Sequence, residues 1–392
     1  MQFRTFGKKV TDFHPSALGF GAMRLPLLDD VPARINEPEA IRMIRYAIDH
    51  GVNYVDTAYP YHGGQSEIVV GKALQDGYRD KVMLATKLPV SQVKVEADTE
   101  RFLEEQLKKL DVDHIDFYLC HGIGKSRWET MKQTRVLDTL AKALNDGRIR
   151  HLGFSFHDDL AAFKTIVDGS DMWEFCQIQY NYMDIQRQAG TEGLRYAAGK
   201  GLGVVIMEPL LGGRLANTRP PEAIQRIWDA APVRRTPAEW GLQWVWNQPE
   251  VSVVLSGMNT FEQVVQNVES AGRSGVGSLT PAELEVIDKV RETYRALQPI
   301  ACTACNYCQP CPSGIPIPDH FARYNDAVAY NAFPMYRRGY SRMDENKKAN
   351  ACAVCRECLD KCPQHLEIPD LLVEVHRVLG ENQDPSPLSP LS

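Results

Sequence analysis

Short apolar runs rich in β-branched residues alternate with helical patterns from about residue 18 to residue 270. Several runs are apolar throughout, as expected of parallel strands that are covered on both faces. Between them, apolar residues recur at helical spacing, as in Ala40–His50, Glu100–Leu110 and Val136–Leu144. Eight strand–helix units over about 250 residues predict an α/β fold, a closed (β/α)8 TIM barrel. The eight candidate strands are Ala17–Phe20, Val52–Thr57, Val82–Thr86, Ile115–Cys120, His151–Ser155, Cys176–Tyr180, Val204–Met207 and Val251–Leu255.

An open, doubly wound sheet is the alternative for such an alternation. That fold normally carries a Gly-x-Gly-x-x-Gly turn after its first strand. The nearest segment, Gly19 to Arg24, lacks the third glycine. The barrel is therefore favoured, with Phe3–Thr11 expected to form a hairpin that closes its bottom.

The cysteines are concentrated in one part of the chain. Eight of the ten lie between Cys302 and Cys362. They form a repeat of three cysteines at x2 spacing, followed each time by Cys-Pro and then by Ile-Pro-Asp. Three such cysteines can occupy three corners of one Fe4S4 cube, and in two-cluster ferredoxins the Cys-Pro cysteine serves the other cube. The sequence therefore predicts two [4Fe-4S] clusters. The predicted ligands are Cys302, Cys305, Cys308 and Cys362 for one cluster, and Cys352, Cys355, Cys358 and Cys311 for the other.

The first cysteine run departs from the bacterial ferredoxin spacing, because two residues rather than three precede Cys311. This departure leaves the ligand pairing of the first run less well defined. One or two structural zinc sites are the alternative, since zinc modules also use paired Cys-x2-Cys. Triplets closed by Cys-Pro exceed what zinc needs, so iron–sulfur is favoured. The segment between the runs, including Phe321–Asn331, has a helical pattern, which predicts a mainly helical domain.

These patterns divide the chain into a barrel at 1–280, a connecting helix at 281–300, a dicluster domain at 301–380 and a disordered tail at 381–392. A net charge of −6 argues against a nucleic-acid partner, because phosphate binding needs clustered lysine and arginine. No apolar run reaches the ~18 residues that span a membrane. The first residues show no apolar signal segment, so a cytoplasmic location is expected.

Three short motifs lie at the carboxyl ends of successive predicted strands. They are Asp-Thr-Ala-Tyr-Pro-Tyr at 56–61, Leu-Ala-Thr-Lys at 84–87 and Tyr-Leu-Cys-His at 118–121. In order and spacing they resemble the catalytic motifs of aldo-keto reductases, and the resemblance spans about residues 1–275. With the cysteine-rich segment, the chain is similar to a subgroup that carries a ferredoxin extension. The resemblance implies a catalytic tetrad of Asp56, Tyr61, Lys87 and His121.

The chemistry of these side chains supports the same roles. Reduction of a carbonyl by hydride needs a proton donor at the oxygen, and a phenol with a pKa of ~10 is a poor match to neutral pH. A nearby ammonium lowers that pKa, so Lys87 can activate Tyr61 while Asp56 holds Lys87 in place. His121 then orients the carbonyl. Tyr59 is the competing phenol, but the motif offset selects Tyr61.

The resemblance also implies a site for NAD or NADP. Gln177 matches the residue that binds the nicotinamide carboxamide, whereas Met207 replaces an aromatic residue that often stacks on the ring. Gly257 and Gln263 stand where basic residues often bind the 2′-phosphate of NADP, so the choice between the two nucleotides stays open. The full set of expected contacts is Ser155, Gln177, Met207, Pro209, Leu210, Gly212, Gly213, Gly257, Gln263 and Asn267.

Together these features predict an NAD(P)-dependent oxidoreductase that reduces an aldehyde or ketone to an alcohol, or catalyses the reverse reaction. The clusters would transfer electrons, with a ferredoxin or another electron-transfer protein as candidate partner, or would brace the structure. Two alternatives are a redox sensor or electron-transfer protein with a nucleotide-binding barrel, and a flavin-assisted reductase. The sequence does not identify the substrate.

Overall fold

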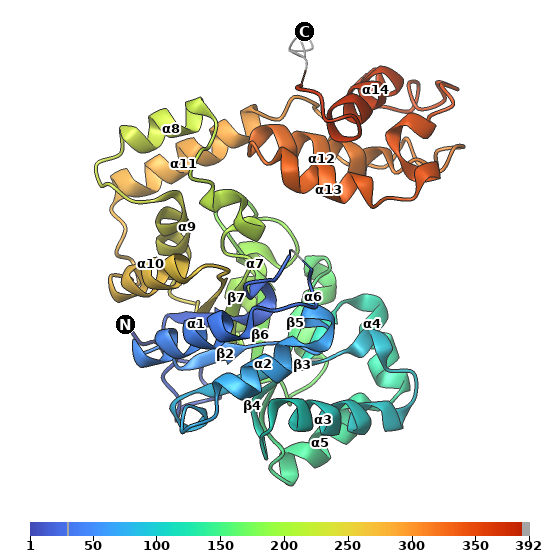
Figure 1. Ribbon diagram of the computed structural model, residues 1–392. Helices are drawn as coiled ribbons and strands as arrows, with labels where there is room; N and C mark the ends of the chain where they lie inside the picture. The colour runs from blue at the N-terminus through green and yellow to red at the C-terminus, as the bar shows by residue number, and fades with distance from the viewer. Residues whose placement is uncertain (30, 386–392) are drawn as a thin grey trace. The chain divides into compact units, whose positions relative to one another are not determined.

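The computed structural model describes residues 1–29 and 31–385, so the last part of the predicted disordered tail, 386–392, lies outside the described residues. Eight parallel strands form a closed barrel in chain order, with β1 beside β8. Figure 1 shows the barrel with helices around it. The predicted barrel is confirmed, and the open sheet is wrong. The strands are β1 Leu18–Gly21, β2 Tyr54–Asp56, β3 Met83–Leu88, β4 Ile115–Ile123, β5 Ile149–Phe156, β6 Phe175–Gln179, β7 Gly203–Met207 and β8 Val253–Gly257.

Amphipathic helices follow the strands and bury their apolar sides. Helix α3, for example, buries Phe102, Leu103, Leu107 and Leu110, and it ends at Asp111 in the left-handed conformation. The barrel helices are α1 Glu37–Asp49, α2 Ser66–Ala73, α3 Glu96–Leu110, α4 Lys125–Gln133, α5 Val136–Asn145, α6 Leu160–Asp168, α7 Gly190–Gly199, α9 Pro237–Trp246 and α10 Phe261–Gly272. The remaining helices are α8 Glu222–Asp229, α11 Pro281–Ala296, α12 Ile317–Ala329, α13 Phe333–Ser341 and α14 Ile368–Leu379.

The N-terminal segment closes one end of the barrel. In place of the predicted hairpin, the segment has two isolated antiparallel bridges, one between Phe6 and Val10 and one between Phe3 and Ser16. The ring of Phe6 is fully buried, and its centroid lies 4.7 Å from that of Phe117 and 5.6 Å from that of Phe175. Gly7 follows with a φ of +67°, and a side chain there would collide with the backbone at the start of β7. The turn can therefore dock against the strands only because residue 7 is glycine.

The chain forms two compact units, and the insertion between β7 and α9 belongs to the second. The first unit contains Met1–Gly213 and Ala238–Thr280, and the second contains Arg214–Pro237 together with the chain from Pro281 onward. Within the second unit, Arg235 forms an ion pair with Glu283 of α11. The boundaries expected from the sequence instead assign 214–237 to the barrel domain, and that assignment remains a prediction.

The second unit has its own apolar core, built mainly from α12, α13 and α14. The predicted helical character of this region is confirmed. In residues 1–29 and 31–385, no helix combines the length and apolar character needed to cross a bilayer.

Replacement of the ring that plugs the barrel should destabilise the first unit. We expect Phe6→Ala to lower the free energy of unfolding by about 3–5 kcal/mol, because a large aromatic side chain leaves a cavity. Phe3→Ala is the matched control, since Phe3 is 55% exposed and should change stability by less than ~0.5 kcal/mol. Urea denaturation followed by tryptophan fluorescence measures both values. Equal effects for the two variants would contradict the plug assignment.

Candidate active site and cysteine sites

The carboxyl ends of three neighbouring strands bring the predicted tetrad together. Asp56 ends β2, Lys87 lies near the end of β3, and His121 lies near the end of β4. Tyr61 opens the short 3-10 helix η2, Tyr61–Gly64, that follows β2. This is the end of the barrel at which enzymes of this fold carry their reactive residues.

Lys87 is the centre of the arrangement. Its side chain is 1% exposed, and its Nζ donates to Asp56 Oδ1 at 2.6 Å and to the Thr57 carbonyl oxygen at 2.7 Å. The same Nζ lies 3.5 Å from the Tyr61 hydroxyl. Burial alone would lower the pKa of Lys87, but Asp56 and Tyr61 outweigh burial and raise it. Lys87 is therefore a fixed ammonium. The Thr57 contact was not predicted from the sequence, because it comes from the backbone.

The pKa of Tyr61 depends on burial as well as on the charge of Lys87. Burial raises the pKa of Tyr61, while Lys87 lowers it and Asp56 raises it further. The effect of Lys87 therefore has the predicted sign, but burial outweighs it, and the net pKa of Tyr61 lies above its ordinary value. The desolvation free energy of a buried phenolate is larger than its attraction to one nearby ammonium, because that ammonium is already paired with Asp56.

His121 stands edge-on to Tyr61, with ring centroids 6.0 Å apart and an interplanar angle of 82°. Burial lowers the pKa of His121 to about 3, and the nearby positive charge of Lys87 adds to this shift. The imidazole is therefore neutral at physiological pH. Tyr59, the competing phenol, donates to Glu105 on α3 at 2.8 Å and is engaged there.

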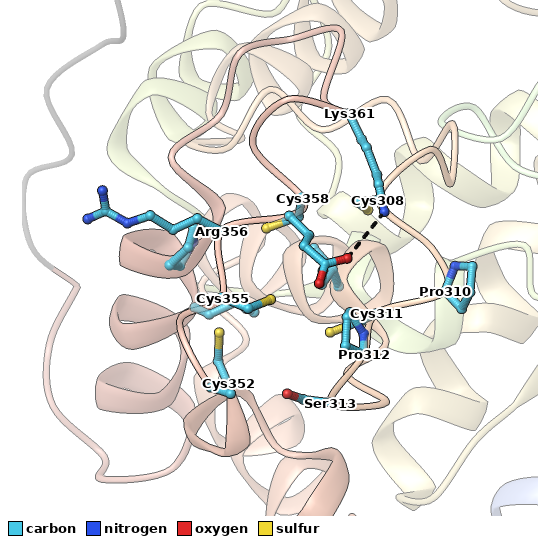
Figure 2. A pocket seen from close by; sticks show the side chains of 15 residues that line it. Cys308, Pro310, Cys311, Pro312, Ser313, Cys352, Cys355, Arg356, Cys358 and Lys361 are labelled. Carbon is cyan, nitrogen blue, oxygen red and sulfur yellow. Dashed lines mark ion pairs between the residues drawn. The ribbon is translucent and has the colours of Figure 1, made fainter.

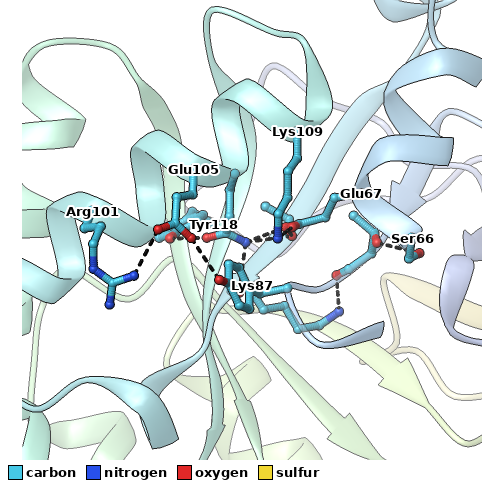
Figure 3. Close-up of polar contacts among 11 residues, drawn as sticks. Ser66, Glu67, Lys87, Arg101, Glu105, Lys109 and Tyr118 are labelled. Carbon is cyan, nitrogen blue, oxygen red and sulfur yellow. Dashed lines mark hydrogen bonds and ion pairs between the residues drawn. The ribbon is translucent and has the colours of Figure 1, made fainter. Parts of the chain in front are cut away.

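A buried polar network supports the backbone of Lys87 (Figure 3). Glu67 is fully buried on α2 and accepts hydrogen bonds from Thr86 at 2.7 Å and from Gln106 at 2.6 Å. Gln106 also donates to the Lys87 carbonyl oxygen at 3.1 Å and accepts from the Tyr118 hydroxyl at 2.6 Å. This network was missed in the sequence. The available signal was the placement of Gln106 on the same side of α3 as its buried leucines.

Two of the expected nicotinamide contacts present polar groups on β5 and β6. Ser155 and Gln177 are both buried. The Ser155 Oγ accepts from the Gly122 N–H at 2.7 Å, which leaves its hydroxyl proton free to be donated. Among the described residues, Gln177 Oε1 has no hydrogen-bond partner. A buried oxygen without a partner is costly, so this position fits a ligand that donates an N–H group, such as a carboxamide.

The segment after β7 exposes backbone in an unusual conformation. Met207 and Leu210 are partly exposed and Pro209 is buried. Gly212 and Gly213 have φ values of +67° and +97°, and the space where a Gly213 side chain would point is open. Glycine at both positions leaves room for a ligand to approach the backbone closely.

The third group of expected contacts lies at the end of β8 and on α10. Gly257 ends β8 and is exposed. Gln263 accepts from the Asn259 N–H at 2.9 Å, and the buried Asn267 donates to Ser256 Oγ at 3.0 Å. These amides hold the start of α10 in place, and neither Gly257 nor Gln263 adds a positive charge there.

The eight clustered cysteines surround two cavities in the second unit, and all are free thiols. Each cavity collects three cysteines of one run and the Cys-Pro cysteine of the other, while Cys308 lines both. Figure 2 shows the cavity that contains Cys311, Cys352, Cys355 and Cys358. Apolar side chains such as Ile317, Phe321 and Ile368 complete the walls. The first cavity is lined by Cys302, Cys305, Cys308 and Cys362, and the second by Cys352, Cys355, Cys358 and Cys311.

The two cysteine loops share an unusual backbone geometry. Ala304 and Asn306 have φ values of +56° and +64°, and their counterparts Val354 and Arg356 have +53° and +63°. The shorter spacing before Cys311 therefore leaves the loop of the first run unchanged at these positions. Among the described residues, no three His, Cys, Asp or Glu side chains converge as they would on a single metal ion. Thiols spread around a cavity fit the corners of an Fe4S4 cube.

The chain matches two family models. The aldo/keto reductase family model matches residues 17–292, and a 4Fe-4S dicluster domain model matches residues 301–366. L-galactose dehydrogenase from Arabidopsis thaliana is 27% identical over 308 residues, which cover 73% of this chain and 94% of that protein.

Solved structures give the same result. An aldo-keto reductase from Bacillus halodurans, in its holo form, is 26% identical with a TM-score of 0.61. An aldo-keto reductase from Klebsiella pneumoniae in complex with NADPH is 25% identical with a TM-score of 0.60. Each comparison covers 74% of this chain and 96% of the other. The chain therefore belongs to the aldo/keto reductase family of oxidoreductases and carries a 4Fe-4S dicluster domain after its barrel.

Proposed function

We propose that this protein interconverts a small-molecule carbonyl compound and the corresponding alcohol with NAD or NADP. The observation that carries the proposal is the position of Lys87 Nζ, which binds Asp56 and the Thr57 carbonyl and lies 3.5 Å from the Tyr61 hydroxyl. When bound, the nicotinamide supplies the hydride. Tyr61, protonated at neutral pH, gives its proton to the carbonyl oxygen as the alcohol forms. The fixed ammonium of Lys87 stabilises the phenolate that remains.

His121 has a separate role in this proposal. Because it is neutral, it can donate a hydrogen bond to the carbonyl oxygen without competing as a proton source. The unpartnered oxygen of Gln177 and the open backbone at Gly213 support a nucleotide site beside it. The absence of a basic residue at Gly257 and Gln263 leaves both NAD and NADP as candidates.

We further propose that the eight cysteines hold two [4Fe-4S] clusters, with the fourth ligand of each cluster exchanged between the runs. The cavity that joins Cys362 to Cys302, Cys305 and Cys308 supports this pairing. Such clusters carry single electrons, so a ferredoxin or another electron-transfer protein is the candidate partner. Hydride transfer does not require that step, and a bracing role is the alternative for the clusters.

The proton donor is tested by removing one oxygen atom. We expect Tyr61→Phe to lower kcat/KM for 4-nitrobenzaldehyde by about 10²–10⁴-fold, because the reaction loses its general acid. The affinity for the nucleotide should stay unchanged. Tyr59→Phe is the matched control and should retain activity, since Tyr59 is bonded to Glu105. Unchanged turnover in Tyr61→Phe would exclude this donor and favour the redox-sensor alternative.

The buried neutral imidazole should make stability depend on pH. The pKa of His121 is about 3 in the folded chain and about 6.5 when unfolded. As the pH falls below about 6.5, the unfolded chain takes up a proton that the folded chain excludes, so the folded state loses stability. Between pH 7 and pH 5, we expect the free energy of unfolding to fall by about 1–2 kcal/mol less in His121→Asn than in the wild type. Urea denaturation of both proteins measures the difference, and parallel profiles would contradict it.

The exchange of ligands is tested by iron content after anaerobic purification. The wild type should hold about eight iron atoms per chain, from two four-iron clusters. Cys305→Ala with Cys362→Ala should remove about four, because both residues serve one cluster. Cys355→Ala with Cys362→Ala should remove about eight, because each serves a different cluster. The opposite pattern would show that each run supplies its own fourth ligand. Cys176→Ala, in the barrel core, is the control and should retain all the iron.

A further inference from the structure

The turn after β1 places the side chain of Arg24 against Gly212 and Gly257, two of the glycines expected to bind nucleotide. Arg24 ends the short 3-10 helix η1, Ala22–Arg24, directly after β1. A Cβ built on Gly257 would lie 3.1 Å from Arg24 Cδ and 3.2 Å from its Cγ. A Cβ built on Gly212 would lie 3.4 Å from Arg24 Nη2. The stem of Arg24 therefore crosses Gly257, and its guanidinium reaches Gly212.

The backbone around Arg24 is fixed by the elements that also carry Tyr61. Ser66 Oγ on α2 donates to the Ala22 carbonyl oxygen at 2.9 Å. The Leu25 N–H donates to His62 Nε2 of η2 at 3.2 Å. Both flanks of Arg24 are thus tied to the segment between β2 and α2, which presets the direction of its side chain.

The guanidinium is available to a ligand. Arg24 is exposed, and among the described residues its side chain forms no ion pair or hydrogen bond. An arginine with uncommitted donors beside an open glycine backbone is suited to a phosphate, which it can bind through two parallel hydrogen bonds. A larger residue at 257 would displace the side chain of Arg24. Glycine at this position therefore leaves space for a positive charge supplied by the turn after β1 rather than by residue 257 itself.

We propose that Arg24 binds the pyrophosphate of the dinucleotide, bridging the end of β8 and the glycine segment after β7. This inference rests on the nucleotide binding proposed above. The pyrophosphate is favoured over the 2′-phosphate because only the stem passes Gly257, whereas the charged group lies at Gly212. Arg24 is accordingly a binding residue for a part that NAD and NADP share, and it does not select between them.

The test is nucleotide affinity, measured on the anaerobically purified full chain by quenching of tryptophan fluorescence. We expect Arg24→Met, which keeps an unbranched stem, to weaken binding of NAD+ and NADP+ by the same factor, about 10–100-fold. Binding of ADP-ribose should weaken likewise, whereas binding of 2′-AMP, which has no pyrophosphate, should not change.

Arg34→Met is the matched control. Arg34 lies in the same loop and the substitution removes the same charge, but its guanidinium is paired with Asp29 at 2.5 Å. It should leave all four affinities unchanged. Equal affinities in Arg24→Met and the wild type would overturn the proposal, as would a loss confined to NADP+ and 2′-AMP. If the wild type itself binds neither NAD+ nor NADP+, the proposed function fails together with the role of Arg24. A failure of the Arg24 role alone is recognised by tight nucleotide binding in both proteins.

Discussion

A buried ammonium is the constraint around which the candidate active site of the barrel is organised. Lys87 is 1% exposed, and a charge at such a position is tolerated only when it is paired and fully hydrogen-bonded. Asp56 supplies the opposite charge and the Thr57 carbonyl a second acceptor. The β2–β3 register, which sets Asp56 beside Ala85, delivers both groups to Lys87. Removal of Asp56 would leave the buried ammonium without an opposite charge, so the geometry of these two strands and the position of the ammonium depend on each other.

The same burial sets the protonation states around Lys87. Burial raises the pKa of Tyr61 and lowers that of His121, so both side chains are neutral beside one fixed positive charge. In the proposed reaction, the phenol keeps its proton until a developing alkoxide takes it. The phenolate that remains would be stabilised by the Lys87 ammonium, which is already in place and needs no reorganisation during the reaction. The absolute pKa of Tyr61 in the free protein therefore matters less than the change that a bound substrate and nucleotide produce.

The sequence predicted the barrel because strand and helix patterns are short-range, and the resemblance of three motifs to those of aldo-keto reductases gave the candidate tetrad. Apolar runs mark the strands, and the carboxyl ends of parallel strands must meet at one face. What it could not predict depends on contacts between distant segments or on side-chain direction. The sign of the Tyr61 shift depends on how deeply the ring is buried, and the Glu67–Gln106 hydrogen bond joins residues 39 positions apart. The path of Arg24 depends on how the turn after β1 is fixed by α2.

The cysteine repeat shows how a duplicated sequence can produce a unit whose halves are interdependent. Each run alone supplies three thiols to its cavity, and the fourth comes from the Cys-Pro turn of the other run. Ile317 and Ile368, which open α12 and α14 directly after those turns, line the cavities and also belong to the apolar core. A cluster bound as proposed would thus join the two halves through its ligands and support the core that both share. Because thiol ligation and core packing involve the same short segments, loss of either cluster should loosen both halves rather than one.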